Sequence, residues 1–187
     1  MKLIVTRHGE TEENKKGILM GHTPGKLSNL GKEQAKKVAL RLKDEKIDYI
    51  YSSDLARAVD TAKEIKKFHQ NSILVLTENL RECDLGIHTG KSYNSLDWNT
   101  RPKECEDRIS MKKRVKELLD DVYTKYPNKT VLFVAHDGIN KQIFKLIMDQ
   151  PVDFKIESQS NTAINIFELC EDKNHKIHLM GCTKHLE

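Results

Sequence analysis

Two histidines in this sequence each follow an apolar run that has the composition of a buried strand. His8 comes after the run 3–5, His136 comes after the run 131–135, and a glycine lies within two residues of each histidine. Open α/β sheets bind their ligands at the carboxyl ends of the strands, so strand ends that are distant in sequence can meet in one pocket. We therefore expect the two imidazoles to face a common site.

Two arginines and one glutamate accompany these histidines at predicted strand ends and helix starts. Arg7 directly precedes His8, Arg57 lies near the start of a predicted helix, and Glu82 follows a short apolar segment. Guanidinium groups stay charged at any working pH and match phosphate oxygens in a bidentate manner. Free backbone N–H groups at a helix start add positive potential. The set predicts an anion pocket that suits a phosphate group.

A series of strands and helices must position these side chains. Apolar runs rich in Ile, Val, Leu, Phe and Tyr predict the strands, and apolar residues spaced three and four apart predict helices between them. Ser110 precedes the third helix and is predicted to cap its amino terminus. The predicted strands are 2–6, 47–51, 73–76, 130–135, 163–169 and 176–180, and the apolar faces of the helices fall within 35–42, 55–65, 111–122 and 139–147.

The order of these elements predicts an α/β fold. Strands and helices alternate, which implies a three-layer α/β/α arrangement around a mostly parallel sheet, with an antiparallel hairpin of the last two strands supplying one antiparallel edge strand. The stretch from about 84 to 109 has no regular pattern and is too long for a plain connection, which predicts a lid or substrate loop. A length of 187 residues suits one domain over 1–187.

Composition narrows the classes of function. The sequence has 37% hydrophobic and 32% charged residues and a formal net charge of +4, with lysines mixed among glutamates, which disfavours a nucleic-acid partner. It has no apolar stretch long enough for a membrane span and no signal-peptide pattern, so we expect a cytoplasmic protein with no membrane partner. Its four cysteines form no CxxC pair, which argues against a zinc site.

Several motifs along the chain resemble those of one known family. Beyond Arg7-His8-Gly9, they comprise Asn14, Gly21, the stretches 27–35, 52–62 and 80–82, Arg114-Val115, the stretch 134–138 and Asn161-Thr162. In this order they resemble the histidine phosphatase superfamily, in its phosphoglycerate mutase-like branch. The resemblance covers most of the chain and implies the phosphoglycerate mutase-like fold.

The resemblance also implies a role for each matching residue. His8 would be the nucleophile that forms a phosphohistidine, and Glu82 would give a proton to the leaving oxygen and later act as the base for water. A neutral imidazole shielded by cations suits attack on an anionic phosphate ester. No metal and no cofactor would be needed. The residues expected to bind the phosphoryl group or the substrate are Arg7, Asn14, Gly21, Arg57, His136, Asp137 and Asn161.

The sequence departs from the family in the part that would face the substrate. The family often shows an aromatic-Gly-x-Trp-Glu-Gly run after the acid, whereas the stretch 85–90 here lacks the Trp-Glu pair. Lys141 stands where the family often has an arginine. The roles of four further side chains, as substrate contacts or as ordinary surface groups, stay open: His22, His88, Lys91 and Trp98.

The leading hypothesis is a metal-independent phosphatase that hydrolyses small phosphorylated metabolites, as a monomer or homodimer. One alternative is a cofactor-dependent phosphoglycerate mutase. Mutases of this family are longer and carry an adjacent Arg-Arg pair, whereas Arg101 and Arg108 stand apart in this short chain. The other alternative, a non-catalytic phosphate-binding module, is disfavoured by the intact His8 and His136.

Overall fold

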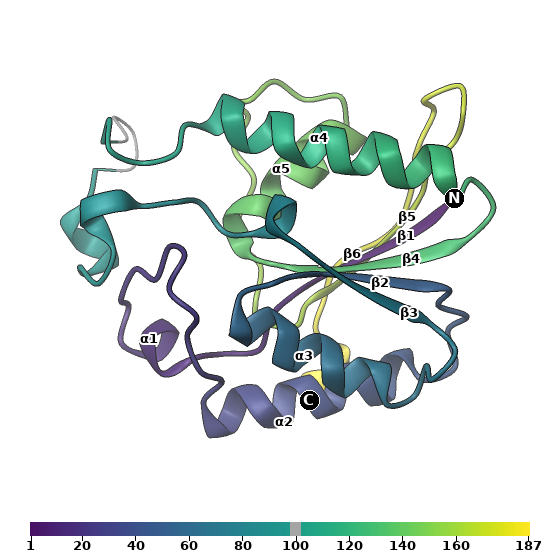
Figure 1. Cartoon of the computed structure of the whole chain (residues 1–187), viewed down its shortest axis with the longest axis horizontal. Helices are drawn as coiled ribbons and strands as arrows, with labels where there is room; N and C mark the ends of the chain where they lie inside the picture. Colours follow the sequence, from purple (N-terminus) through teal and green to yellow (C-terminus); the bar gives the residue numbers. More distant parts are fainter. Residues whose placement is uncertain (98–101) are drawn as a thin grey trace.

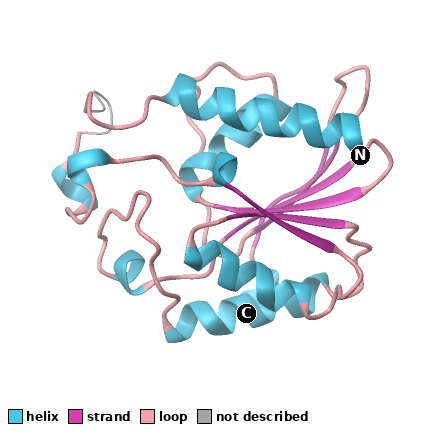
Figure 2. Cartoon of the chain, viewed as in Figure 1, coloured by secondary structure: helices cyan, strands magenta, loops and turns pink. Residues whose placement is uncertain are grey.

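A computed structural model describes residues 1–97 and 102–187 of the chain. One six-stranded sheet runs through the middle in the order β3-β2-β4-β1-β5-β6, and helices cover both of its faces (Figures 1 and 2). The strands are β1 (Lys2–Arg7), β2 (Tyr49–Ser53), β3 (Ile73–Thr77), β4 (Thr130–Ala135), β5 (Ile164–Glu168) and β6 (Lys176–Cys182). The predicted three-layer α/β/α architecture is confirmed.

Two apolar clusters hold the helices against the sheet, one on each face. Helices α4 (Arg108–Lys125) and α5 (Asp137–Ile147) pack on one face. Helices α2 (Asn29–Leu42) and α3 (Ala56–Lys66) pack on the other. The inner strands are apolar toward both layers, so Leu3, Ile4 and Val5 of β1 are fully buried, as expected for a covered parallel sheet. Burial of this kind is the main stabilising contribution.

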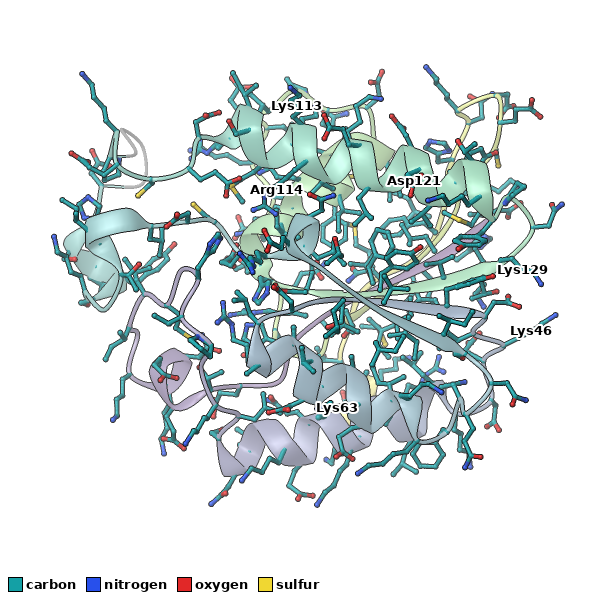
Figure 3. The ribbon with its side chains drawn as sticks, in the orientation of Figure 1. Lys46, Lys63, Lys113, Arg114, Asp121 and Lys129 are labelled. Atoms are coloured by element: carbon teal, nitrogen blue, oxygen red, sulfur yellow. The ribbon has the colours of Figure 1, made fainter. Side chains whose placement is uncertain are left out.

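The remaining elements are short. They are helix α1 (Glu12–Lys15) and the 3₁₀ turns Glu78–Leu80, Gly86–His88, Tyr93–Ser95 and Lys184–Leu186. Among the described residues no helix combines the length and the apolar character that a bilayer span requires. Figure 3 shows Lys63 of α3, Lys113 of α4 and the loop residues Lys46 and Lys129 at different places on the surface.

Strand pairing agrees with the predicted mostly parallel sheet. β1, β2, β3 and β4 pair in parallel, and β5 pairs antiparallel with both β1 and β6. The last two strands therefore form the expected antiparallel hairpin at one edge. The prediction that Ser110 caps the third long helix is wrong, because the carboxylate of Asp107 accepts the backbone N–H groups of Ile109 and Ser110.

The register of the two central strands decides where the site lies. Arg7 at the end of β1 pairs with Ala135 at the end of β4, so His8 and His136 leave the sheet next to each other. The backbone N–H of His8 donates to the carbonyl of Ala135 at 3.0 Å. The predicted meeting of two distant strand ends follows directly from this register.

A close approach between two backbones explains the glycine after His8. A Cβ on Gly9 would lie 2.5 Å from the carbonyl oxygen of Gly31, and a Cβ on Gly31 would collide with the backbone of Glu10. Gly31 is in the first turn of α2, whose amino terminus is capped by Ser28. Two glycines in contact let the turn after β1 pack tightly against α2, and this contact fixes the backbone that carries His8.

Candidate active site

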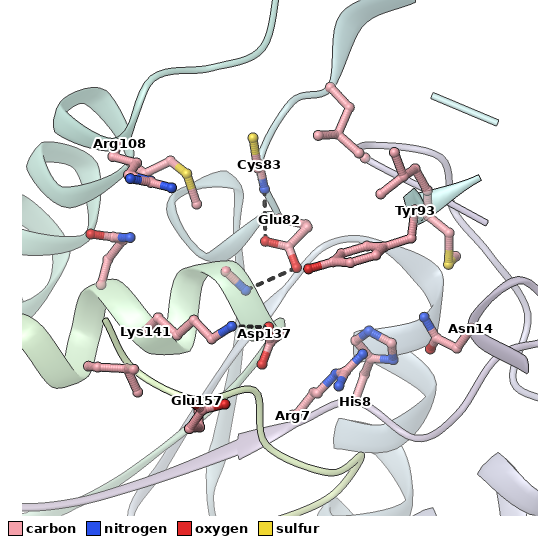
Figure 4. A pocket seen from close by; sticks show the side chains of 18 of the residues that line it. Arg7, His8, Asn14, Glu82, Cys83, Tyr93, Arg108, Asp137, Lys141 and Glu157 are labelled. Carbon is pink, nitrogen blue, oxygen red and sulfur yellow. Dashed lines mark hydrogen bonds and ion pairs between the residues drawn. The ribbon is translucent and has the colours of Figure 1, made fainter. Parts of the chain in front are cut away.

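A cavity of about 860 Å³ opens at the carboxyl ends of the central strands. Figure 4 shows Arg7, His8 and Asn14 on one side of it and Glu82 between them and Arg108. We call the part lined by Arg7, His8, Asn14 and Arg57, together with His136, which is fully buried beside His8, the inner end of the cavity. It lies where the sequence predicted an anion pocket.

The imidazole of His8 is buried, and its partner fixes its tautomer. Nδ1 lies 2.7 Å from the carbonyl oxygen of Gly9, which can only accept, so Nδ1 carries the proton. Burial, with the positive charges of Arg57 and Arg7 added, holds the pKa of His8 well below its ordinary value of 6.5. The ring is therefore neutral near pH 7 and its Nε2 lone pair is available for attack on an electrophile.

His136 is fully buried beside His8 and has the opposite tautomer. The two ring centroids are 5.0 Å apart, with the planes tilted by 57°. The Nε–H of Arg57 donates to Nδ1 of His136 at 3.2 Å, so the proton sits on Nε2, which has no partner within the described chain. Burial and then the charge of Arg57 lower the pKa of His136 far below 6.5. His136 thus presents an N–H donor and no full charge.

Arg57 reaches the inner end from the first turn of α3, with only 1% of its surface exposed. Its Nη1 donates to the carbonyls of Thr23 and Pro24, and its Nη2 donates to the carbonyl of Gly21 at 3.0 Å. Burial lowers its pKa to about 10, which leaves it charged near pH 7. Arg57 therefore fastens the 21–24 loop and orients His136, in addition to supplying positive charge.

Arg7 and Asn14 complete the inner end. Nη1 of Arg7 donates to the carbonyl of Gln159 at 2.8 Å, while its buried Nε has no partner among the described residues. Asn14 is held by a capping box with Thr11 at the start of α1, in which its side-chain oxygen accepts the Thr11 N–H. Both side chains line the cavity, and the Asn14 amide nitrogen is a donor that can serve an oxyanion there.

The carboxylate of Glu82 borders the cavity beside the start of α5. Its two oxygens accept the backbone N–H groups of Cys83 at 2.9 Å and of Gly138 at 3.2 Å. A Cβ on Gly138 would lie 2.5 Å from this carboxylate, so only glycine lets it approach the helix. The backbone carbonyl of Glu82 accepts from His22 Nε2 at 2.8 Å and from Arg114 Nη2 at 3.2 Å. His22 and Arg114 therefore position this residue.

The other predicted binding residues support the cavity from its edges. Gly21 lines the cavity with a φ of +48°, and its carbonyl accepts a hydrogen bond from Arg57. Asp137 lines it and pairs with Lys141 at 2.7 Å, while its other oxygen accepts the Gln159 N–H. The amide nitrogen of Asn161 donates to the carbonyl of His8 at 2.9 Å, so Asn161 holds the His8 backbone from outside the cavity lining.

The side chains with open roles take different places. His22 contacts Glu82 as described, and His88 lies 3.5 Å from the carboxylate of Glu104, away from the cavity lining. Lys91 is exposed, and its backbone carbonyl pairs with Leu19. Trp98 and Arg101 lie outside the described residues.

The cavity is also lined by residues that the sequence did not single out, among them Tyr93, Gln142, Lys145, Asp153 and Glu157. Figure 4 shows the Tyr93 ring pointing toward Glu82. Tyr93 could have been suspected as an aromatic residue in the irregular stretch 84–109. Lys145 lies two helical turns after Asp137 and so shares its face, but this signal is too common to be used without coordinates.

The inner end combines a neutral nucleophile with donors for a charged group. Nε2 of His8 carries a lone pair, Nε2 of His136 carries a proton, and Arg7 and Arg57 supply charge. Within 1–97 and 102–187, no three His, Cys, Asp or Glu side chains are grouped so that they could hold a metal ion. A phosphoryl group in transfer carries negative charge spread over its equatorial oxygens. The cations and N–H donors of the inner end are arranged so that they can stabilise this charge.

Comparison with known proteins adds independent information. The sequence profile of the histidine phosphatase superfamily (branch 1) matches residues 3–183. Phosphoserine phosphatase 1 of Hydrogenobacter thermophilus is 33% identical, over 100% of this chain and 94% of its own length. Phosphoglycerate mutase-like protein 4 of Arabidopsis thaliana is 30% identical, over 100% of this chain and 87% of its own length.

Solved structures give the same result for the fold. The YhfR protein of Bacillus stearothermophilus superposes with a TM-score of 0.91 at 25% identity, covering 100% of this chain and 99% of that one. Phosphoserine phosphatase of Entamoeba histolytica, in complex with 3-phosphoglyceric acid, superposes with a TM-score of 0.84 at 28% identity, again covering 100% and 99%.

Proposed function

This chain belongs to the histidine phosphatase superfamily (branch 1) and is a phosphoric monoester hydrolase, and we propose that His8 carries the phosphoryl group during its reaction. The observation that carries this proposal is the pair of complementary tautomers at the inner end. Nε2 of His8 carries a lone pair and Nε2 of His136 carries a proton that it can donate, and the centroids of the two rings are 5.0 Å apart. One ring can attack phosphorus while the other binds a phosphoryl oxygen.

In the first half-reaction, Nε2 of His8 bonds to phosphorus as the ester P–O bond breaks. The positive charge that develops on the imidazole is stabilised by the Gly9 carbonyl, which accepts from Nδ1–H. Arg7, Arg57 and His136 neutralise the charge on the phosphoryl oxygens. For this step Glu82 must be in its carboxylic acid form, which gives its proton to the leaving oxygen, a step worth roughly 10²–10⁴-fold for a poor leaving group.

In the second half-reaction, the Glu82 carboxylate takes a proton from a water molecule. The water oxygen bonds to phosphorus, the P–N bond to His8 breaks, and inorganic phosphate leaves. Glu82 is then protonated again and His8 is neutral, so the cycle closes without a further reactant. Because fixed cations and N–H donors supply the electrostatic stabilisation, we propose that the reaction is independent of metal ions.

The substrates proposed are small phosphorylated metabolites. Relatives of this chain are named phosphoserine phosphatases, and one is named a glucosyl-3-phosphoglycerate phosphatase. A mutase would return the phosphoryl group to a sugar acid instead of water. An assay with 3-phosphoglycerate, with and without 2,3-bisphosphoglycerate, measures released phosphate against isomerised product and separates the two reactions.

The proposal extends to the organisation of the chain. We propose one domain over 1–187, in which the stretch 84–109 serves as a lid or substrate loop. Leu85, Tyr93 and Arg108 of this stretch line the cavity, and backbone hydrogen bonds join residues 90–93 to residues 17–19. A cytoplasmic location and a monomeric or homodimeric state complete the proposal.

The decisive experiment measures phosphate release from p-nitrophenyl phosphate and phosphoserine in the presence of EDTA. We expect turnover to survive chelation, and His8→Ala to lower kcat by at least about 10³-fold, as loss of a nucleophile does. Rapid quenching of the reaction in alkali, which preserves phosphohistidine, should show a phosphoryl group bound to the wild-type protein and none bound to His8→Ala.

His178→Ala provides the matched control, since this histidine is half exposed and pairs with Glu168 at the sheet edge. Its kcat should equal that of wild type. Activity of His8→Ala above a few per cent of wild type, or turnover that disappears with EDTA, would refute the assignment.

A further inference from the structure

We infer that the cavity has a second anion subsite at the end remote from His8, formed by Arg108, Lys141, Gln142 and Lys145, and that preferred substrates carry a second anionic group there. We call these four residues the outer end of the cavity. All four line the same cavity as His8. The inference rests on the proposed phosphatase reaction, and it names the class of leaving group.

The outer end is built on one face of α5. Asp137, Lys141 and Lys145 are spaced by four residues and lie above one another along the helix. The helix rises about 10 Å from Gly138, which contacts Glu82, to Lys145. Figure 4 shows Arg108 and Lys141 across the cavity from His8 and Asn14, with Glu82 between. A leaving group protonated by Glu82 would therefore extend toward these cations.

Lys145 is the unusual member of this set, because a charged side chain with 5% exposure needs compensation. Its ammonium donates to the Val152 carbonyl, which satisfies one of its three N–H groups. Burial and then the positive charges of Arg108, Lys112 and Lys141 lower the pKa of Lys145, with Asp153 acting in the opposite direction. Positive charge exceeds negative charge around Lys145, so a bound anion would be stabilised there.

The other charged groups at the outer end leave this balance positive. Lys141 forms an ion pair with Asp137 and donates to Ser158. Asp153, Lys155 and Glu157 also line the cavity, from exposed positions on the loop over α5 where water screens them. This part of the lining therefore holds the cations Arg108, Lys141, Lys145 and Lys155 against the carboxylates Asp137, Asp153 and Glu157, an excess of one positive charge.

Gln142 adds a requirement for a donor on the substrate. It is 4% exposed and lines the cavity, and its Oε1 has no hydrogen-bond partner among the described residues. A buried acceptor without a partner costs stability, so a ligand hydroxyl or amino group that reaches it is favoured. The substrate class is a phosphate monoester whose leaving group carries a second carboxylate or phosphate at its far end, beside a hydroxyl or amino group.

A chain-length series of synthetic esters tests this inference. We would compare hexyl phosphate, 6-carboxyhexyl phosphate and hexane-1,6-diol bisphosphate with the short 2-carboxyethyl phosphate. We expect kcat/KM to be at least tenfold higher for the two long dianionic esters than for hexyl phosphate, with a smaller gain for the short acid. The carboxylate and phosphate arms show which terminal anion is preferred.

Two variants locate the effect. Arg108→Gln and Lys145→Gln should each reduce the preference over hexyl phosphate to about threefold or less, mainly through KM. Lys116→Gln is the control, because this lysine is exposed on α4 and pairs with Asp120. Thermal melting checks folding, and if Lys145→Gln does not fold, Arg108→Gln carries the test alone.

The outcomes separate this inference from the proposed function. Wild-type protein that turns over p-nitrophenyl phosphate but treats all long esters alike would overturn the subsite and leave the phosphatase assignment intact. A preference that survives in Arg108→Gln would also overturn the subsite. Protein that hydrolyses none of these esters would refute the proposed function itself.

Discussion

The two ends of the cavity are built in different ways. At the inner end, His8 and His136 leave paired strand ends, and their ring nitrogens are fixed by Gly9 and Arg57. At the outer end, the lysines of α5 contact the loop that contains Val152 and Ser158. The sheet therefore fixes one end, and loops complete the other.

Because of this difference, the residues that carry out the reaction and the residues that select the substrate belong to different parts of the fold. The inner end is held by backbone groups of the turn after β1 and of the 21–24 loop between α1 and α2, so its geometry depends on the fold as a whole. The outer end depends on side chains and loop length, which can change without disturbing the sheet. We therefore expect substitutions at the inner end to change kcat for every substrate, and substitutions at the outer end to change the ranking of substrates.

Glu82 stands between the ends and gives the largest test of this division. Glu82→Gln should lower kcat/KM for alkyl phosphates by roughly 10²–10⁴-fold, because a poor leaving oxygen needs the proton. The loss for p-nitrophenyl phosphate should be less than about tenfold, since its leaving group is stable as an anion. Rates are measured on both esters with the same protein preparation.

Glu78→Gln is the matched control for this change. Glu78 is 75% exposed and pairs with Arg81, away from the cavity. It should leave both rates at the wild-type level. Equal losses of Glu82→Gln on the two esters would mean that Glu82 is not the proton donor.

Arg57 tests whether the inner end works as one hydrogen-bonded unit. Arg57→Lys keeps the charge but removes the Nε–H that sets the tautomer of His136, and we expect kcat to fall by about 10²–10³-fold on every ester, as when one oxyanion donor is lost. Arg41→Lys, at a partly exposed position on α2 outside the cavity lining, is the control and should have wild-type kinetics. A loss confined to KM, or to one substrate, would contradict the positioning role.

The protonation of the two inner histidines is the next test. Both pKa values lie well below 6.5, so ring NMR should show neutral His8 with Nδ1–H and neutral His136 with Nε2–H, and neither should titrate near pH 6.5. The unfolded chain binds these protons at about pH 6.5. Folding stability is therefore full above that pH and falls as the pH drops below it, so Tm should decrease from pH 7 to 5.5.

A midpoint near 6.5 for either ring would show that the inner end is less shielded than the structure indicates. The same spectra distinguish the tautomers, because protonated and unprotonated ring nitrogens have different ¹⁵N shifts. If both rings carried the same tautomer, the division into an attacking nitrogen and a donating nitrogen would fail.

Much of the fold follows from local sequence patterns. The apolar runs before His8 and His136 predict buried strands because β-branched and apolar residues suit a covered sheet, and the structure has both strands there. The meeting of the two histidines could be expected from the rule that ligands bind at strand ends. These expectations succeed because they depend on short segments and on one general property of parallel sheets.

The details of the site depend on contacts between distant residues and could not be predicted. Arg57 donates to carbonyls more than thirty residues away, and Asn161 donates to the backbone of His8. Periodicity marks Lys145 as a polar position on α5, yet the loop around Val152 buries it. No local pattern in a sequence specifies which loop will cover a helix.

The smallest expected effect concerns the amino-terminal cap of α4, which lies where the 84–109 stretch joins this helix. Sequence spacing favoured Ser110, but the carboxylate of Asp107 accepts two backbone N–H groups and the Ser110 hydroxyl. Asp107→Ala should therefore lower Tm by about 2–4 °C, because lost N-caps have effects of this size in chains of similar length. Ser110→Ala should change Tm by less than about 1 °C, because the same backbone donors keep their acceptor.

Since Arg108 follows the cap directly, Asp107→Ala should also weaken any preference for dianionic esters more than it affects p-nitrophenyl phosphate. If Ser110→Ala lowered Tm more than Asp107→Ala, Ser110 would be the cap, and the outer end would not depend on Asp107.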